Sequence, residues 1–143
     1  MLSIITVVLN DRDGLEKTLN SLMNEDKNNY EHILIDGGSV DGTVEYIKTR
    51  FDRIDCLVSE PDKGIYDAMN KGVGLASGAV ISFLNAGDLA LNGYVSCAEK
   101  CTSGIDYCYS GIKISGKSLK SFIPKKISSR TEFLQSMPFP HPG

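Results

Sequence analysis

The sequence of 143 residues lacks the segments that direct a chain into or across a membrane. No window approaches the run of about 18 apolar residues that a membrane-spanning helix requires. The first ten residues, MLSIITVVLN, have neither the basic region nor the small-residue cleavage site of a secretory signal peptide. These absences predict a cytoplasmic protein, and the length suits about one domain with a buried core.

Cysteine pairs of the metal-binding kind are missing as well. The four cysteines, at positions 56, 97, 101 and 108, include no C-x-x-C pair, and neither His32 nor His141 stands near them in the sequence. Structural zinc sites and disulfide frameworks depend on such spacing. Buried or half-buried free thiols are therefore expected.

The net charge is small, −3, but it is unevenly distributed. Residues 112–143 hold six basic side chains and one acidic side chain, a net charge of +5, which leaves −8 for residues 1–111. The basic end is either a solvated surface or a surface that attracts anionic phosphates or lipids. Because aromatic residues do not alternate with the basic ones, nucleic-acid binding is not expected.

Short apolar runs rich in β-branched residues recur along the chain. Such runs are typical of strands that are covered on both faces of a sheet. The strands predicted in this way are 3–9, 32–36, 54–59, 79–84 and, with a less regular pattern, 107–114.

Patterns of helical period separate the strands. Asp13 has the spacing of a helix cap before a face that contains Leu15 and Leu19, and Asp41 is placed to cap a second helix. A third helix is predicted from apolar residues that recur every three or four positions, namely Ile65, Met69, Val73 and Ala76. A short helix is predicted at 131–137.

This alternation predicts an α/β fold, a mainly parallel sheet with helices on both faces. Ligands of such sheets bind beyond the carboxyl ends of the strands. Three polar clusters fall there, namely Asn10-Asp11, DGGSVDGT from Asp36, and NAGD ending at Asp88. With no repeat and no boundary signal, residues 1–143 are predicted to form a single domain.

Two common nucleotide-binding motifs are absent. A dinucleotide-binding domain needs G-x-G-x-x-G directly after its first strand, where this chain has NDRDG, and there is no Walker A loop. The phosphates of a nucleotide would therefore have to be bound by some other group. The group that this sequence offers is a divalent cation held by a carboxylate.

Four segments, in order, resemble the family 2 glycosyltransferases of GT-A fold. They are IITVVLN, HILIDGGSVDGT, SEPDKGIYDAMNKGVGLASG and ISFLNAGD, with a weaker match in MPFPHP. The similarity is strongest to the branch found in bacterial capsule and exopolysaccharide clusters. It implies a Rossmann-like GT-A sheet in which residues 1–111 form the nucleotide-binding core. Residues 112–143 would begin the acceptor-side region, which includes His141.

The resemblance also implies a nucleotide site. Val7 and Leu9 match the strand end that borders the base, and Asp36 matches the carboxylate that accepts a hydrogen bond from it, commonly from uracil. The alternative for Asp36 is an Asx turn that closes DGGS. The partner implied is a nucleoside-diphosphate sugar, most often a UDP-sugar.

The segment SEPDKGIYDAMNKG matches the part of the family that crosses the nucleotide. Lys63 is either a cation for the diphosphate or an exposed turn lysine. Asn70 is expected to face the sheet edge and to bind the nucleotide. Two aspartates of the segment would hold Lys63 or orient the loop, namely Asp62 and Asp67. Core packing is predicted for two further residues, Tyr66 and Met69.

NAGD aligns with the metal-binding D-x-D motif of the family but departs from it. Asn85 and Gly87 stand where many members have acids, so Asp88 alone is expected to ligate Mn²⁺ or Mg²⁺. Gly87 would let the sugar diphosphate lie close to the backbone. The alternative is that NAGD is only a turn.

The implied reaction is sugar transfer, with inversion, to a hydroxyl of a glycan or lipid-linked acceptor. It would take place in the cytoplasm or peripherally at the inner face of the membrane. The catalytic base of the family lies in a later acidic motif that this chain does not match, which leaves Asp106 and Glu132 as candidates. The chain is therefore expected to be truncated before its base. The alternative is a nucleotide-sugar-binding module with weak or no activity.

Overall fold

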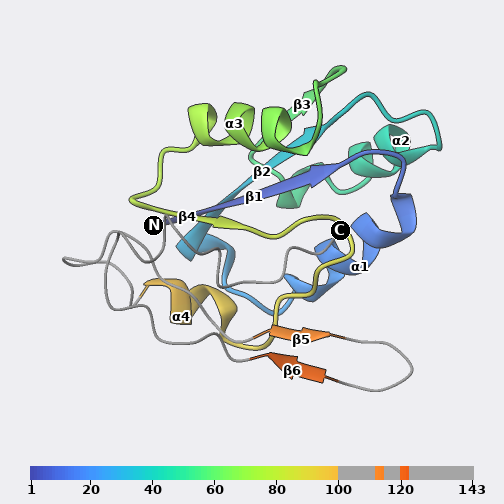
Figure 1. Ribbon diagram of the computed structural model, residues 1–143. Coiled ribbons are helices and arrows are strands. Elements are labelled where there is room, and N and C mark those ends of the chain that lie inside the picture. The colour runs from blue at the N-terminus through green and yellow to red at the C-terminus, as the bar shows by residue number, and fades with distance from the viewer. Residues whose placement is uncertain (100–111, 115–119, 123–143) are drawn as a thin grey trace, which may run out of the picture. The chain divides into compact units, whose positions relative to one another are not determined.

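The computed structural model describes residues 1–99, 112–114 and 120–122 (Figure 1). The chain divides into two compact units, residues 1–105 and 106–143. The described part of the second unit is an antiparallel pair, β5 (Ile112–Ile114) and β6 (Lys120–Phe122). The single-domain organisation predicted from the sequence stays a prediction.

The first unit is built on a sheet of four parallel strands in the order β3-β2-β1-β4. This confirms the predicted α/β fold. The strands are β1 (Leu2–Val8), β2 (Tyr30–Asp36), β3 (Cys56–Ser59) and β4 (Val80–Phe83). Val8 pairs with Asp36, and Asp36 pairs with Ser59. The carboxyl ends of β1, β2 and β3 therefore finish level with one another.

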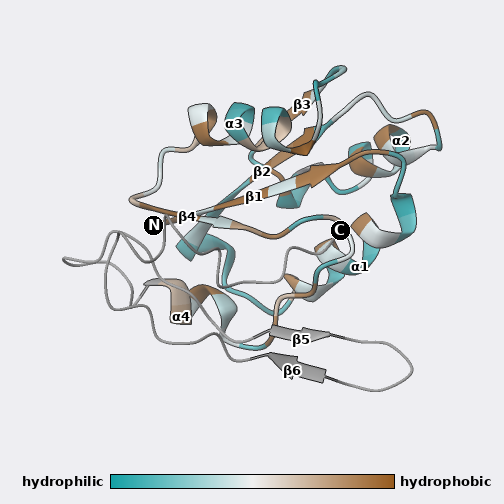
Figure 2. Cartoon of the chain, in the orientation of Figure 1, coloured by the Kyte–Doolittle hydropathy of each residue, from teal (hydrophilic) through white to brown (hydrophobic). Residues whose placement is uncertain are grey.

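Helices cover both faces of this sheet. They are α1 (Arg12–Ser21), α2 (Thr43–Lys48), α3 (Ile65–Leu75) and α4 (Tyr94–Glu99), with 3-10 turns at Lys27–Asn29 and Phe51–Arg53. On one face Ile5 and Ile33 pack with Ala68 of α3. On the other, Val8 packs with Leu15 of α1. Every residue of β1 is buried. Figure 2 shows that the central strands of the sheet, β1 and β2, are largely hydrophobic.

Two helix starts differ in detail from the prediction. The cap of α1 is Asp11, whose Oδ1 accepts from the backbone N–H of Gly14 at 2.9 Å, so the assignment to Asp13 was wrong. Asp13 already lies in the first turn, where its charge favours the helix dipole. Asp41 accepts from the backbone N–H and the hydroxyl of Thr43, so it stabilises the start of α2 as predicted, although Gly42 occupies the cap position.

The buried face of α3 also differs from the prediction. Ile65 and Tyr66 are exposed, and only Met69 of the predicted pair packs against the core. The face against the sheet is made by Ala68 and Gly72. The pattern of large apolar residues was misleading because this helix approaches the sheet too closely for large side chains.

Gly72 supplies a test of that close approach. A Cβ at position 72 would stand 2.5 Å from Cγ2 of Ile5, whereas nothing lies within 4 Å of a Cβ at Gly74. We expect Gly72→Ala to lower the free energy of unfolding by about 1–3 kcal/mol, as overpacked cores do. Gly74→Ala, its control in the same helix, should raise it by up to about 1 kcal/mol. Equal effects of the two substitutions in urea unfolding would contradict close packing at Gly72.

Several predicted elements are only partly described. β5 confirms the end of the strand predicted at 107–114, while residues 107–111 and the helix predicted at 131–137 lie outside the described residues. The elements α4 and β6 were not predicted. In the part of the chain that the structure describes, no helix is both long enough and apolar enough to cross a bilayer.

Candidate functional site

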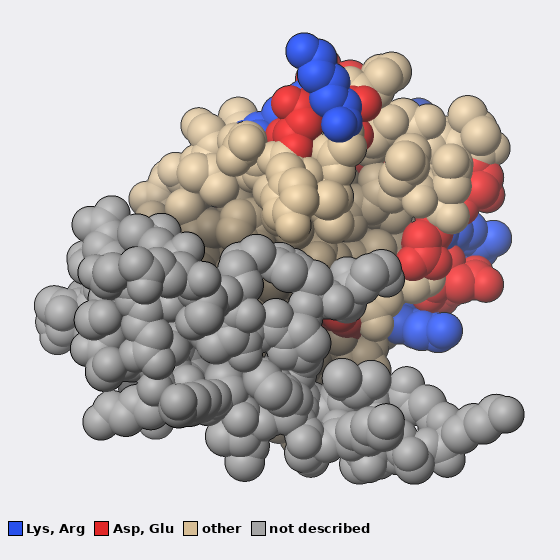
Figure 3. Space-filling view, in the orientation of Figure 1, with Lys and Arg blue, Asp and Glu red and all other residues tan. Residues whose placement is uncertain are grey.

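The loops that follow β1, β2 and β4 are joined at the carboxyl edge of the sheet. The N–H of Gly37 donates to the carbonyl of Val8 at 2.9 Å, and the N–H of Ala86 donates to the carbonyl of Val7 at 3.1 Å. The order of the strands reverses direction between β1 and β4. In open α/β sheets the ligand crevice lies at such a switch point. Charged side chains gather around this edge (Figure 3).

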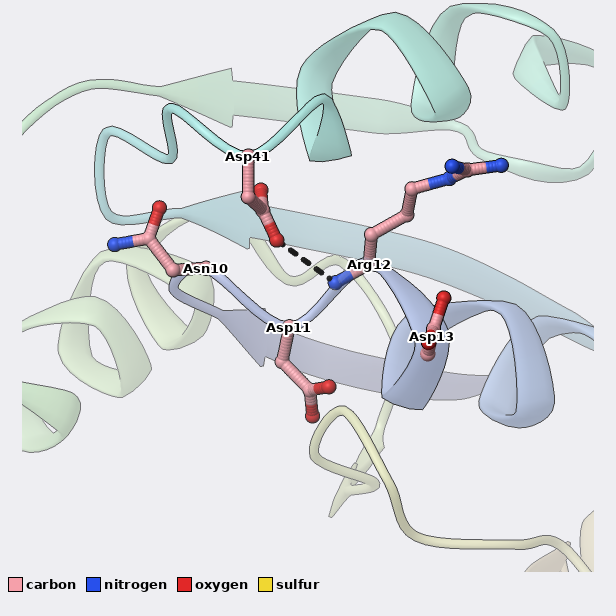
Figure 4. A pocket seen from close by; sticks show the side chains of 5 residues that line it. All are labelled: Asn10, Asp11, Arg12, Asp13 and Asp41. Carbon is pink, nitrogen blue, oxygen red and sulfur yellow. Dashed lines mark hydrogen bonds between the residues drawn. The ribbon is translucent and has the colours of Figure 1, made fainter.

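The turn between β1 and α1 borders an open hollow of about 290 Å³, lined by Asn10, Asp11, Arg12, Asp13 and Asp41 (Figure 4). Asp41 accepts from the backbone N–H of Arg12 at 3.2 Å, and its hydrogen bond from Thr43 holds the pKa of its carboxyl below the usual value. With three carboxylates and one guanidinium, the hollow repels a diphosphate.

Asn10 locks this turn to the loop after β2. Its backbone is left-handed, with φ of +50°, a conformation that asparagine tolerates better than most residues. Its N–H donates to the hydroxyl of Ser39, and its side-chain oxygen accepts from the N–H of Val40, both at 2.8 Å. The first two polar clusters are therefore one connected structure.

Asp36 is fully buried at the end of β2. Its carboxylate accepts from the backbone N–H groups of Gly38 and Ser39 and, at 2.6 Å, from the hydroxyl of Ser59. These bonds form the turn that the sequence offered as an alternative. The role of Asp36 as a base ligand stays a prediction.

Val7 and Leu9, predicted together, lie in different surroundings. Val7 is buried in the core between β1 and α3. Leu9 is 55% exposed, and its Cδ1 lies 3.5 Å from the point where a Cβ on Gly37 would stand. Leu9 is thus the apolar side chain that the strand end exposes, and its role beside a base stays a prediction.

The turn between β3 and α3 presents Lys63 to solvent. Asp62 accepts from the N–H of Gly64 at 2.8 Å, and Asp67 accepts from the N–H of Lys63 at 3.0 Å, so both aspartates orient the loop. Neither forms an ion pair with the Lys63 ammonium group, and no other described residue does. The lysine of this region that is paired is Lys71, whose Nζ lies 2.8 Å from Glu60 and 3.8 Å from Asp67. Lys63 is therefore available to an anion.

Asn70 is exposed on α3. It stands two positions from both Ala68 and Gly72, which face the sheet, so it lies on the opposite side of the helix. Asn70 therefore points away from the sheet face on which α3 packs, and its predicted place at the nucleotide stays a prediction. The helix period of the true buried face places it towards solvent.

The NAGD segment forms a tight turn after β4. Gly87 has φ of +90°, which favours glycine, and the N–H of Asp88 donates to the carbonyl of Asn85 at 3.0 Å. One carboxylate oxygen of Asp88 accepts from the N–H of Asn85 at 3.3 Å. The side chain is exposed, yet partial desolvation by the turn raises the pKa of the Asp88 carboxyl.

The side chain of Asn85 has a polar atom unpaired within the described residues, which the sequence did not indicate. Its side-chain oxygen is buried and has no hydrogen-bond partner among the described residues. Buried polar atoms are nearly always paired, because an unpaired one costs about 1–3 kcal/mol. Asn85 and Asp88 thus place two side-chain oxygens on one short turn, and the role of Asp88 as a metal ligand stays a prediction.

Thr18 of α1 holds this turn in place. Its fully buried hydroxyl lies 2.8 Å from the carbonyl of Asp88 and 3.2 Å from that of Asn85, and it accepts from the N–H of Gly87 at 3.0 Å. Sequence reasoning missed this residue. Thr18 and Asp88 are 70 positions apart, and no local pattern links them.

The remaining predicted site residues, Asp106, Glu132 and His141, lie outside the described residues. Within the described ranges there is no group of three or more histidine, cysteine, aspartate or glutamate side chains that could hold a metal ion. A metal at Asp88 would therefore need oxygen ligands from elsewhere.

Comparison with known proteins gives a consistent result. The model of glycosyl transferase family 2 matches residues 3–95. An uncharacterized glycosyltransferase of Mycobacterium tuberculosis is 44% identical over 87 residues, which are 60% of this chain and 33% of that protein. The glycosyltransferase AglE of Haloferax volcanii is 34% identical, over 58% of this chain and 29% of its own. The chain spans about a third of the length of these relatives.

Solved structures agree with the fold. TarS of S. aureus, in complex with UDP-GlcNAc, superposes with a TM-score of 0.62 over 69% of this chain and 30% of its own, at 19% identity. The mannosyltransferase PcManGT of Pyrobaculum calidifontis, in complex with GDP-Man and Mn²⁺, gives 0.58 over 68% and 30%, at 20% identity. These similarities establish a shared GT-A fold.

Proposed function

The chain belongs to glycosyl transferase family 2, and from this premise we propose that it binds a nucleoside-diphosphate sugar for transfer to an acceptor hydroxyl. The observation that carries the proposal is the exposed Asp88 on a turn tied to the end of β1. Within the same unit, Lys63 is a cation at the carboxyl end of β3 that no described residue pairs. A diphosphate needs such positive charge, supplied directly or by a bound cation.

The nucleotide would lie along the carboxyl edge of the sheet. Leu9 offers an apolar surface to the base, beside a stretch of backbone at Gly37 that carries no side chain. Lys63 would contact the diphosphate, and Gly87 would let it approach the backbone of the turn. UDP is the first candidate, because UDP-GlcNAc is bound by the similar TarS.

Two oxygens of the NAGD turn support the proposal of a hard divalent cation there. The carboxylate of Asp88 has one oxygen that accepts no hydrogen bond from a described residue, and the same is true of the side-chain oxygen of Asn85. Mg²⁺ and Mn²⁺ prefer oxygen ligands and are often held by one or two carboxylates together with substrate phosphates. When bound, such an ion offsets the charge that develops on the leaving diphosphate. PcManGT, which shares the fold, is seen with Mn²⁺.

The chemistry that remains is proton removal from the acceptor. We propose inverting transfer, in which a carboxylate takes the proton of the acceptor hydroxyl as the sugar moves. Asp106 and Glu132 remain the candidates in this chain. A glycan or lipid-linked acceptor of surface polysaccharide synthesis, reached from the cytoplasm or from the membrane surface, is part of this proposal.

A second candidate is a nucleotide-sugar-binding module without transfer activity. The family match covers residues 3–95, all within the part that would bind the donor, and neither base candidate lies in it. Release of free sugar or transfer to added acceptors, measured with a radiolabelled UDP-sugar, separates the two. Donor binding without either product would favour the binding module.

A binding experiment tests the shared part of both candidates. We expect UDP to bind the chain in calorimetry and to bind at least about tenfold more tightly with Mn²⁺, because the ion would join the diphosphate to Asp88. Uridine, which has no phosphate, should gain nothing from Mn²⁺ and serves as the control. A folded chain that binds no nucleoside diphosphate in either condition would overturn the proposed function.

A further inference from the structure

Asp62 holds a carboxylate oxygen directly over Gly37. A Cβ added to Gly37 would stand 2.5 Å from Oδ2 of Asp62 and 3.5 Å from Cδ1 of Leu9. The two side chains therefore converge on one position, where the backbone carries no side chain of its own. An apolar surface and a hydrogen-bond acceptor lie side by side there.

The two oxygens of Asp62 have different tasks. Oδ1 accepts from the N–H of Gly64 at 2.8 Å, which fixes the side chain on the β3–α3 turn. Oδ2 accepts no hydrogen bond from any described residue, and the side chain is only half-buried. Nearby Lys71 is engaged by Glu60 and by the carbonyl of Pro61. Oδ2 is thus a fixed acceptor that a ligand can reach.

Asp36 lacks that freedom. It is fully buried, and its two oxygens already serve the N–H groups of Gly38 and Ser39 and the hydroxyl of Ser59. A base that took a hydrogen bond from Asp36 would have to compete with these donors. By its contacts, Asp36 shapes the loop rather than meeting a ligand.

We propose that Asp62 selects the base: its Oδ2 receives the ring N–H of uracil or guanine while Leu9 contacts the ring. This deepens the proposed function and rests on it. Cytosine has a lone pair where uracil has N3–H, so it would meet the carboxylate acceptor to acceptor. A site built around a specific hydrogen bond rejects an analogue that lacks the donor, because the site's own group is then left unpaired.

The test compares nucleoside diphosphates of equal charge. UDP, GDP and CDP are titrated by calorimetry in the presence of Mn²⁺ into the chain and into Asp62→Asn. The wild-type chain should favour UDP or GDP over CDP by at least about tenfold, as expected for a hydrogen bond to a charged group. Asp62→Asn should remove most of that preference by weakening the binding of the favoured nucleotide. Comparison of the UDP and GDP affinities shows which base the site recognises.

Two matched substitutions make the outcome specific. Asp67→Asn changes a carboxylate of the same loop that faces the N–H of Lys63, and it should leave the preference unchanged. Asp36→Asn tests the other candidate. Thermal melting of each protein shows that it is folded. In Asp62→Asn the loop is expected to keep its shape, because the amide oxygen of the new side chain can still accept from the N–H of Gly64.

The failures are distinguishable. If no nucleoside diphosphate binds, the proposed function falls and the assignment of Asp62 falls with it. If they bind but the wild-type chain does not discriminate, or Asp62→Asn keeps the discrimination, only the assignment of Asp62 is overturned. If only Asp36→Asn loses the discrimination between nucleoside diphosphates, the hydrogen bond to the base is assigned to Asp36 instead.

Discussion

Asp88→Asn should abolish the gain in UDP affinity that Mn²⁺ provides and leave the affinity without metal unchanged. Asparagine keeps the size of aspartate, and its oxygen can still accept the hydrogen bond from Asn85, so the turn is retained. Only the charge is removed. Because the loss of groups that merely support a metal ligand already costs about 10–100-fold, we expect a loss of at least tenfold in the presence of Mn²⁺.

The pH dependence gives the same prediction a second readout. Partial desolvation raises the pKa of the Asp88 carboxyl, and a protonated carboxyl does not bind a cation well. The Mn²⁺ effect should therefore fade at a higher pH, on acidification, than it would for a carboxyl of ordinary pKa. In Asp88→Asn no such titration should be seen.

Asp13→Asn is the matched control for Asp88→Asn. Asp13 is an exposed carboxylate in the first turn of α1, and its substitution should leave the Mn²⁺ effect intact. If Asp88→Asn keeps the full effect of Mn²⁺ while the protein melts normally, Asp88 is not a metal ligand. The NAGD segment would then be a turn and nothing more.

Stability should fall by about 3 kcal/mol between pH 6.5 and pH 4 because of His32 alone. Burial lowers the pKa of His32 from 6.5 to about 4, with a smaller contribution from the charge of Lys27. Each unit of difference between the folded and unfolded pKa corresponds to about 1.4 kcal/mol. Since the folded-state pKa is lower, the unfolded chain takes up the proton first, and the stability that is present above pH 6.5 is lost on acidification.

The surroundings of His32 explain why it stays neutral. Its Nε2 lies 2.9 Å from the hydroxyl of Thr6, and that hydroxyl is 2.7 Å from the carbonyl of Leu84. Because the Thr6 hydroxyl donates to the carbonyl, it accepts from the Nε2–H of His32, and burial of the ring disfavours its charged form. The ring is fully buried, and it forms a T-shaped ring pair with Tyr30.

Urea unfolding at a series of pH values measures this effect. In His32→Gln, whose amide can still donate to Thr6, the loss between pH 6.5 and pH 4 should shrink by most of the roughly 3 kcal/mol expected for the histidine. His141→Gln changes the other histidine of the chain and should retain the loss attributed to His32. A pH dependence that is the same in His32→Gln and in the unmodified chain would show that His32 is not its source.

The sheet could be predicted from the sequence because each strand contains a short run dominated by apolar residues. Residues 3–9 and 32–36 lie between two layers of helices, so both faces are apolar and the pattern is plain. The third helix was placed correctly in the sequence, but its buried face was not. That face depends on the absence of a side chain at Gly72 and on the small side chain of Ala68, which a search for large apolar residues passes over.

The candidate site was predictable where it follows strand ends and unpredictable where it depends on contacts between distant residues. Asp88 and Lys63 stand in loops that the alternation of elements placed at the carboxyl edge. The clamping of the NAGD turn by Thr18 and the approach of Asp62 to Gly37 join residues far apart in the chain. No local periodicity or motif in the sequence predicts such contacts.

The bonds of Thr18 have a consequence for transplanting this loop. The NAGD turn is held from outside as well as by its own hydrogen bonds: the hydroxyl of Thr18 reaches both of its ends, and that of Ser21, one helical turn later, accepts the N–H of Ala90 at 2.9 Å. A designer who grafted residues 85–90 onto a foreign scaffold would move Asp88 and leave behind the two hydroxyls that hold its turn. The smallest portable piece is the loop together with the stretch of α1 that carries those two hydroxyls.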